Sequence, residues 1–173
     1  MTKHKGENRR EAFLEAAVHV FAHKGYYRAT TGDVAKEANI SQPYIYHFYK
    51  NKEELLTAAL RKAWDRILRS FDTVSGDPGD IGERFIKTYE NLMQTHKDEI
   101  LLQVQAQAIR EMAVQEVMQE GLRTIKDYVL NRFQAANIEN APQKVSDFLA
   151  RGMLCNVAAA LDMPELMPNK HKK

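Results

Sequence analysis

The chain has 173 residues, of which 44% are hydrophobic and 28% are charged, and it contains one cysteine. These fractions are those of an ordinary folded protein and exclude wholesale disorder, collagen and coiled-coil arrays. The longest apolar run, Val157 to Leu161, is far shorter than the roughly 20 residues that cross a bilayer. The basic N-terminus lacks the apolar stretch of a secretory signal, and one cysteine cannot form an internal disulfide. We therefore expect a cytoplasmic protein with no membrane-spanning segment.

The net charge of +2 conceals an asymmetry along the chain. Residues 1–69 carry 13 Lys and Arg against eight Asp and Glu, whereas residues 70–173 carry 12 against 15. A basic first part and an acidic second part favour contact of the first part with a polyanion.

The first elements along the chain are predicted from helical spacing of apolar residues, and no stretch alternates as a strand would. Asn8 and Glu11 predict the start of a first helix, which Gly25 ends. Thr30 and Asp33 have the spacing of a capping box and open a short second helix.

A turn and two further helices follow. Asn39 can adopt the left-handed conformation that such a turn needs, and Ser41 caps a short third helix with Pro43 in its first turn. Asn51 and Glu54 repeat the capping pattern and open a long helix that reaches about residue 71.

The glycine- and proline-containing segment from Val74 to Gly82 marks the main boundary. Beyond it, apolar periodicity predicts helices near residues 80–96, 98–111, 113–137 and 142–162. The predicted fold is all-α, with an N-terminal helix-turn-helix DNA-binding domain (residues 1–69) and a C-terminal helical domain for effector binding and dimerisation (residues 70–173).

Residues 30–52 have the helix-turn-helix layout, in which the second short helix enters the major groove of DNA. Ile45 and Tyr49 lie four residues apart and would pack inward with Ile40. The side chains that then project outward can pair with bases, contact a thymine methyl or bind phosphate oxygens. They are Gln42, Pro43, Tyr44, Tyr46 and His47.

Positive side chains flank this segment and suit the phosphate backbone. Lys50 and Lys52 stand where the fourth helix begins, and its free amides would help to hold a phosphate. Sequence-independent contacts are also expected from Lys3, Lys5, Arg9, Arg10 and Arg28. The alternative, a small aromatic core of Tyr44, Tyr46 and Tyr49, is disfavoured because adjacent rings on so short a helix cannot all face inward.

Residues 9–60 resemble the N-terminal domain of TetR-family transcriptional regulators. The residues that carry the resemblance are Phe21, Gly25-Tyr26, Val34-Ala35, Ala38 to Ser41 and Tyr46 to Leu56. The resemblance implies a homodimer that binds a near-palindromic operator on double-stranded DNA. It also implies repression of transcription and release from DNA when a small molecule binds the C-terminal domain.

The chain departs from the family pattern in the second helix. Ala29 stands where threonine is frequent, Thr31 where a larger apolar residue is usual, and Gly32 lies near the helix start. Thr30 is therefore the best candidate for a phosphate contact there. Asn39 replaces the usual turn glycine and keeps the backbone conformation accessible.

The last predicted helix is apolar on two faces, which favours burial of one face against a second subunit. The alternative to a dimer is that this last helix is fully buried inside a monomer. The helix at 113–137 supplies the expected partner face, formed by Val114, Val117, Met118, Leu122, Ile125, Val129 and Phe133.

An effector pocket is expected among the helices at 80–96, 98–111 and 113–137. Its residues and its ligand are not identified, because aromatic and methionine side chains at helical spacing are more often plain core. The candidates are Trp64, Phe85, Tyr89, Met93, Gln103, Gln107, Met112 and Met118.

No motif predicts catalysis, a cofactor or a metal site. His19 and His23 lie four residues apart, but on the predicted solvent side with no third ligand nearby in the sequence, so solvated histidines are the better interpretation. Cys155 is expected to pack as a small hydrophobic residue. Two other functions stay open: a helical small-molecule-binding or interaction module that does not bind DNA, and a helical-bundle enzyme.

Overall fold

The computed structural model describes residues 2–76 and 78–167, and only the backbone of residues 2–8 and of residue 78. All regular structure in these residues is helical, which confirms the all-α prediction. The α-helices are α1 (Thr2–Lys24), α2 (Thr31–Glu37), α3 (Gln42–Ile45), α4 (Lys52–Asp72), α5 (Ile81–Thr95), α6 (Lys97–Ala106), α7 (Met112–Ala135) and α8 (Ala141–Ala160). Two 3-10 turns, η1 (Pro78–Asp80) and η2 (Pro164–Leu166), complete the described elements. Within the described residues, no helix is long and apolar enough to cross a membrane.

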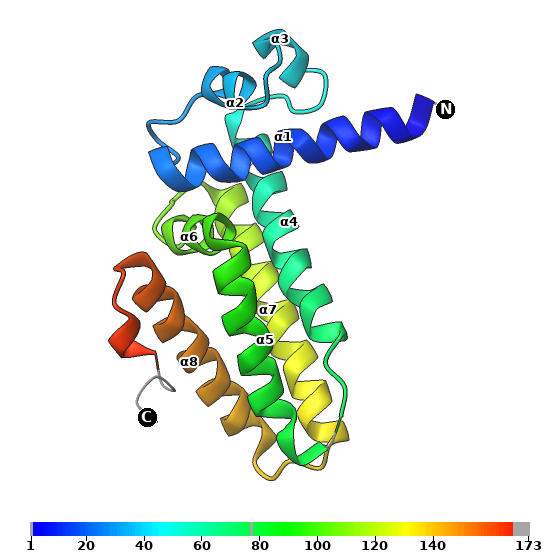
Figure 1. Cartoon of the computed structure of the whole chain (residues 1–173), viewed down its shortest axis with the longest axis vertical. Coiled ribbons are helices and arrows are strands. Elements are labelled where there is room, and N and C mark those ends of the chain that lie inside the picture. Colours follow the sequence, from blue (N-terminus) through cyan, green and yellow to red (C-terminus); the bar gives the residue numbers. More distant parts are fainter. Residues whose placement is uncertain (1, 77, 168–173) are drawn as a thin grey trace.

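The helices form two regions that share α4. Helices α1, α2 and α3 lie together at one end, with α1 crossing α4, whereas α5, α7 and α8 run along the long axis beside α4 (Figure 1). Helix α6 lies directly beneath α1 (Figure 1) and packs against it. Helix α4 continues unbroken through residue 69, so the predicted domain boundary falls inside a helix that belongs to both regions.

The predicted helix starts in the N-terminal region are confirmed at the level of single hydrogen bonds. The Thr30 side chain accepts a hydrogen bond from the Asp33 amide, and the Asp33 carboxylate accepts one from the Thr30 amide. Asn51 Oδ1 accepts from the Glu54 amide at 2.8 Å. Asn39 has a φ of 54° and therefore adopts the left-handed conformation that the turn requires.

Two predicted helix bounds were wrong. Helix α1 begins at Thr2 and not at Asn8, because an Asn and Glu pair three residues apart also fits inside a continuing helix. The helix expected at 98–111 ends at Ala106, and the chain turns there before α7.

The predicted partner face of α7 was also largely wrong, because most of it is buried inside the subunit. Val114 and Val129 are completely inaccessible, and Val117, Ile125 and Phe133 are 5% exposed or less. They belong to the two apolar clusters that α7 forms with α4, the helix it packs against most closely. Of the seven side chains expected to meet another subunit, only Leu122 is well exposed, at 43%.

Candidate DNA-binding surface

Helix α3 is a single turn whose inner side is anchored in the N-terminal core. Ile45 is completely buried and Tyr49 is 3% exposed, as the sequence predicted. The amides of Phe48 and Tyr49 both bond to the Ile45 carbonyl, so the chain after α3 stays tightly wound. This anchoring leaves an outer face of exposed side chains, formed by Gln42, Pro43, Tyr46 and His47.

Tyr44 differs from its expected place, because its ring is half-buried. The ring meets Phe13 of α1 edge-on at 5.7 Å and Phe48 at 5.5 Å between ring centroids. The Tyr44 hydroxyl accepts a hydrogen bond from Arg9 at 3.2 Å. Tyr44 therefore packs α3 against α1 with its ring and pairs with an exposed guanidinium through its hydroxyl.

Thr31 connects the outer face of α3 to α2. Its side chain is 6% exposed. Its Oγ1 accepts a hydrogen bond from Gln42 Nε2 at 2.9 Å and lies 3.0 Å from the Tyr46 hydroxyl. One buried hydroxyl thus holds two exposed side chains in fixed positions. The sequence marked Thr31 only as a polar residue where an apolar one is usual.

Thr30 and Asp33 form a charged cap at the start of α2. The Lys24 ammonium lies 2.5 Å from Asp33 Oδ1, and the Thr30 hydroxyl donates to Asp33 Oδ2 at 2.9 Å. Hydrogen bonds from Lys24 and then Thr30 lower the pKa of Asp33 to about 2. Thr30 is exposed, and its hydroxyl proton is directed at Asp33 rather than at solvent.

Lys52 has different partners from those expected. Its ammonium donates to the backbone carbonyls of Tyr26 at 2.8 Å and Ala29 at 3.1 Å, and a third carbonyl, of Tyr27, lies at 3.5 Å. The same Nζ lies 4.5 Å from the centroid of the Tyr26 ring. These contacts use the three N–H groups of an ammonium, so the geometry favours a role for Lys52 in holding the loop between α1 and α2.

Other positive side chains remain at this surface. Lys50 and Arg28 are exposed, and the Lys50 amide donates to Glu54 Oε2 at 2.6 Å. Arg10 Nε makes a long hydrogen bond of 3.4 Å to the Tyr49 hydroxyl. The side chains of Lys3 and Lys5 lie outside the described residues.

A second candidate site is a narrow cavity of about 60 Å³ in the helical region. Of the predicted pocket residues, Trp64, Tyr89 and Gln103 line it. Phe85 is instead core, and Met112 is exposed. Burial raises the pKa of Tyr89 to about 12 against the effect of its hydrogen bond to Asn156, so this hydroxyl stays neutral and donates to Asn156 Oδ1 at 2.7 Å.

Comparison with known proteins agrees with this geometry. The model of the bacterial regulatory proteins of the tetR family matches residues 13–59. The chain is 30% identical over 130 residues to the HTH-type transcriptional regulator YhgD of Bacillus subtilis, covering 73% of this chain and 68% of YhgD. It is 29% identical over 97 residues to IcaR of Staphylococcus epidermidis, the negative transcriptional regulator of the biofilm operon icaADBC. That match covers 48% of this chain and about half of the relative's length, 52%.

The fold also matches solved structures. Salmonella enterica GusR aligns with a TM-score of 0.75 and 20% sequence identity, over 90% of this chain and 86% of the GusR chain.

Proposed function

This chain belongs to the TetR family of helix-turn-helix transcriptional regulators, which bind DNA and are not enzymes, and we propose that it is a repressor. In this proposal a cytoplasmic homodimer binds a palindromic operator and leaves it when a small molecule binds among the C-terminal helices. Repression is supported by the relative IcaR, whose name describes a negative regulator. The observation that carries the proposal is the exposed face of α3, with two of its side chains fixed by Thr31.

The outer face of α3 has the chemistry for reading base edges. A glutamine amide can pair with both major-groove groups of adenine, and proline or tyrosine can contact a thymine methyl. Because Thr31 already holds Gln42 and Tyr46, less side-chain freedom is lost when DNA binds. We assign base contacts to Gln42, Pro43 and Tyr46, and a phosphate or base contact to His47.

Phosphate contacts are assigned to the charged and hydroxyl groups around this face. Lys50 and Arg28 are exposed and free to approach the DNA backbone, and Arg9 with the Tyr44 hydroxyl forms a further donor pair beside α3. For Thr30 we replace the expected phosphate contact with the capping role that its two hydrogen bonds to Asp33 support. For Lys52 we replace the expected phosphate contact with the loop-holding role that its three carbonyl partners support.

The homodimer is proposed to form mainly through α8. Four large apolar side chains in its C-terminal part and just beyond its last residue are 39–61% exposed, and three of them lie three or four residues from the fourth, Val157, which places all four along one side. They are Met153, Leu154, Val157 and Leu161. Such a row favours a symmetric contact with a second copy, and α7 would add Leu122 rather than the face predicted from its sequence.

The effector is proposed to bind in the cavity behind this row. The cavity is lined by side chains from five helices, among them Trp64, Gln103 and Met153. The Trp64 Nε1 and Gln103 Nε2 donors are buried without a hydrogen-bond partner among the described residues. Two unpaired donors in an apolar wall suit an apolar ligand with a carbonyl, ether or hydroxyl oxygen.

Binding of such a ligand requires the cavity to expand. Its volume of about 60 Å³ is well below the roughly 300 Å³ of a small-molecule site. An outer groove of about 350 Å³ lies beside it, and Trp64, Leu122 and Met153 line both. We propose that these three side chains move apart when the effector enters.

Helix α6 provides the physical connection between this cavity and α1. Gln103 of α6 lines the cavity, and two residues later Gln105 Nε2 donates to the Ala22 carbonyl of α1 at 2.5 Å. A ligand that displaces α6 therefore favours a different position of the N-terminal helices. If that position spaces the two α3 helices wrongly for one DNA turn, roughly 34–36 Å, the population shifts off the operator.

Selection of bound sequences from random DNA tests the proposed function. The expected result is a palindromic motif, which would demonstrate sequence-specific binding and dimer symmetry together. If no motif is enriched, and DNA binding varies with salt concentration but not with sequence, a helical interaction module that does not recognise DNA would be favoured instead.

A further inference from the structure

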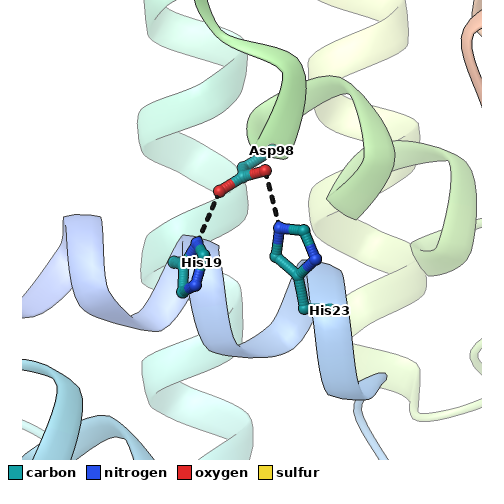
Figure 2. A group of neighbouring side chains, drawn as sticks. All are labelled: His19, His23 and Asp98. Carbon is teal, nitrogen blue, oxygen red and sulfur yellow. Dashed lines mark hydrogen bonds and ion pairs between the residues drawn. The ribbon is translucent and has the colours of Figure 1, made fainter.

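Two histidines of α1 and one aspartate of α6 meet where the N-terminal helices contact the rest of the fold. His19 Nδ1 lies 2.8 Å from Asp98 Oδ2, and His23 Nε2 lies 2.9 Å from Asp98 Oδ1 (Figure 2). One ligand atom from each residue lies within 4.8 Å of the others. The sequence favoured two solvated histidines because Asp98 lies 75 residues beyond His23 and no local spacing reveals it.

We propose that His19, His23 and Asp98 bind a divalent transition-metal ion of the Zn²⁺ class and thereby clamp α1 to α6. Two imidazole nitrogens and one carboxylate oxygen are a common three-ligand set for Zn²⁺, and water completes the coordination. Donor atoms around a tetrahedral Zn²⁺ lie about 3.3 Å apart, given Zn–N and Zn–O bonds near 2.0–2.1 Å. The two imidazole–carboxylate separations of 2.8 and 2.9 Å therefore need to widen by about half an ångström, and no other pair of these ligand atoms is more than 4.8 Å apart.

Metal binding requires only that the N–H protons of His19 and His23 lie on the ring nitrogens that face away from the ion, with no covalent or redox step. A neutral imidazole carries one N–H, and the proton can reside on either ring nitrogen. In the metal-free cluster the inner nitrogens can donate to Asp98, whereas in the metal-bound cluster they present lone pairs and the outer nitrogens carry the protons. The ion replaces the two hydrogen bonds and leaves Asp98 as a ligand.

Asp98 is well suited to act as an anionic ligand. An aspartate carboxyl in contact with solvent is ionised at neutral pH, and the Asp98 side chain is partly exposed. Mixed nitrogen and oxygen donors favour Zn²⁺, Ni²⁺ or Cu²⁺ over Mg²⁺ and Ca²⁺, which prefer oxygen ligands alone.

The cluster is open to an incoming ion and its water. The His19 and His23 side chains are 49% and 53% exposed, and that of Asp98 is 36% exposed. A groove of about 810 Å³ adjoins His19, one of about 310 Å³ adjoins His23, and Asp98 lines both. Solvent therefore reaches the cluster from two sides.

The cluster lies between α1 and α6, so metal binding there is expected to change the affinity of the protein for its operator. Its ligands span the same α1 and α6 contact as the bond from Gln105 to Ala22. This consequence rests on the proposed function: a metal that fixes α1 against α6 changes operator affinity, and by linkage the operator changes metal affinity by the same factor.

Titration of the full-length, untagged, metal-free protein with Zn²⁺ by calorimetry tests the site. Titration with Co²⁺ supports it further, because the visible spectrum of Co²⁺ reports tetrahedral coordination. We expect one ion per chain with micromolar or tighter affinity, and a higher melting temperature with Zn²⁺. His23→Gln and Asp98→Asn should each weaken binding about tenfold or more. His96→Gln is the matched control, because His96 lines the same large groove outside the cluster and its loss should leave affinity unchanged.

Absence of saturable binding, or equal affinity in wild type, His23→Gln and Asp98→Asn, would overturn the proposal. Circular dichroism of each variant shows whether lost binding reflects a lost fold. A melting temperature that does not respond to Zn²⁺ would also overturn it, in favour of direct contacts between the two histidines and Asp98 alone. Since the titration contains no DNA, its outcome is independent of the operator selection.

Discussion

Replacing Thr31 by valine tests whether the hydrogen bonds that orient Gln42 and Tyr46 matter for DNA binding, because both side chains stay in place. Valine has nearly the same shape as threonine, so the 6% exposed site stays filled, but Gln42 and Tyr46 lose their common hydrogen-bond partner. Both partners are themselves exposed and can bond to water instead. We therefore expect little loss of folding free energy, about 1 kcal/mol or less.

The cost should appear in operator binding. DNA would then have to immobilise two side chains that the free protein no longer holds, at about 0.5–1.5 kcal/mol for each. The sum, about 1–3 kcal/mol, corresponds to operator affinity weaker by about 5- to 150-fold. The dependence of affinity on salt should not change, because no phosphate contact is removed.

Fluorescence anisotropy with labelled operator DNA at several salt concentrations measures both quantities. Thr31→Ser keeps the hydroxyl and serves as the control that should bind like wild type. Adding Thr31→Val to Gln42→Ala should cost less than Thr31→Val alone, because part of its effect acts through Gln42. Wild-type affinity in Thr31→Val would refute the proposed role of this hydroxyl.

The remaining predictions concern charge, packing and pH. Lys50→Ala should lower the slope of log affinity against log salt concentration by about one unit. Lys52→Ala should leave that slope unchanged and reduce the free energy of unfolding by about 2 kcal/mol. The reverse pattern in binding and denaturation assays would restore Lys52 as a phosphate contact. Gly121→Ala would place a Cβ in collision with the Trp64 ring, so it should cost about 1–3 kcal/mol and shift the emission of the single tryptophan. Unchanged stability and emission would argue against this packing. Because the pKa of Asp33 falls to about 2 on folding, its stabilisation is complete above its ordinary pKa and is lost as pH falls from about 4 to about 2. Asp33→Asn should reduce the dependence of the free energy of unfolding on pH over that interval, and an unchanged pH profile would count against the cap.

The features that the sequence predicted well depend on residues a few positions apart. The caps at Thr30 and Asn51 each need a partner three residues later, and the turn at Asn39 needs one residue that tolerates a positive φ. The burial of Ile45 and Tyr49 follows from their spacing of four on a short helix. Local stereochemistry decides these features, so a single sequence contains them.

The features that the sequence missed depend on pairs far apart in the chain. Lys52 reaches carbonyls 23–26 residues earlier, and Asp98 meets His19 across 79 residues. Helix α7 shows a further limit, since apolar periodicity reveals that a face is buried but not whether α4 or another subunit covers it. The role of Thr31 was missed for the same reason, because its hydroxyl meets Gln42 and Tyr46 only once α3 is packed against α2.

The outer face of α3 is proposed to contact the bases, and sequence selection with Gln42→Ala beside wild type measures this directly. We expect wild type to select a palindrome, and Gln42→Ala to select the same palindrome with preference relaxed by about 1–3 kcal/mol at one symmetric pair of positions. Identical motifs from both proteins, with identical preference at every position, would show that this face does not carry the specificity.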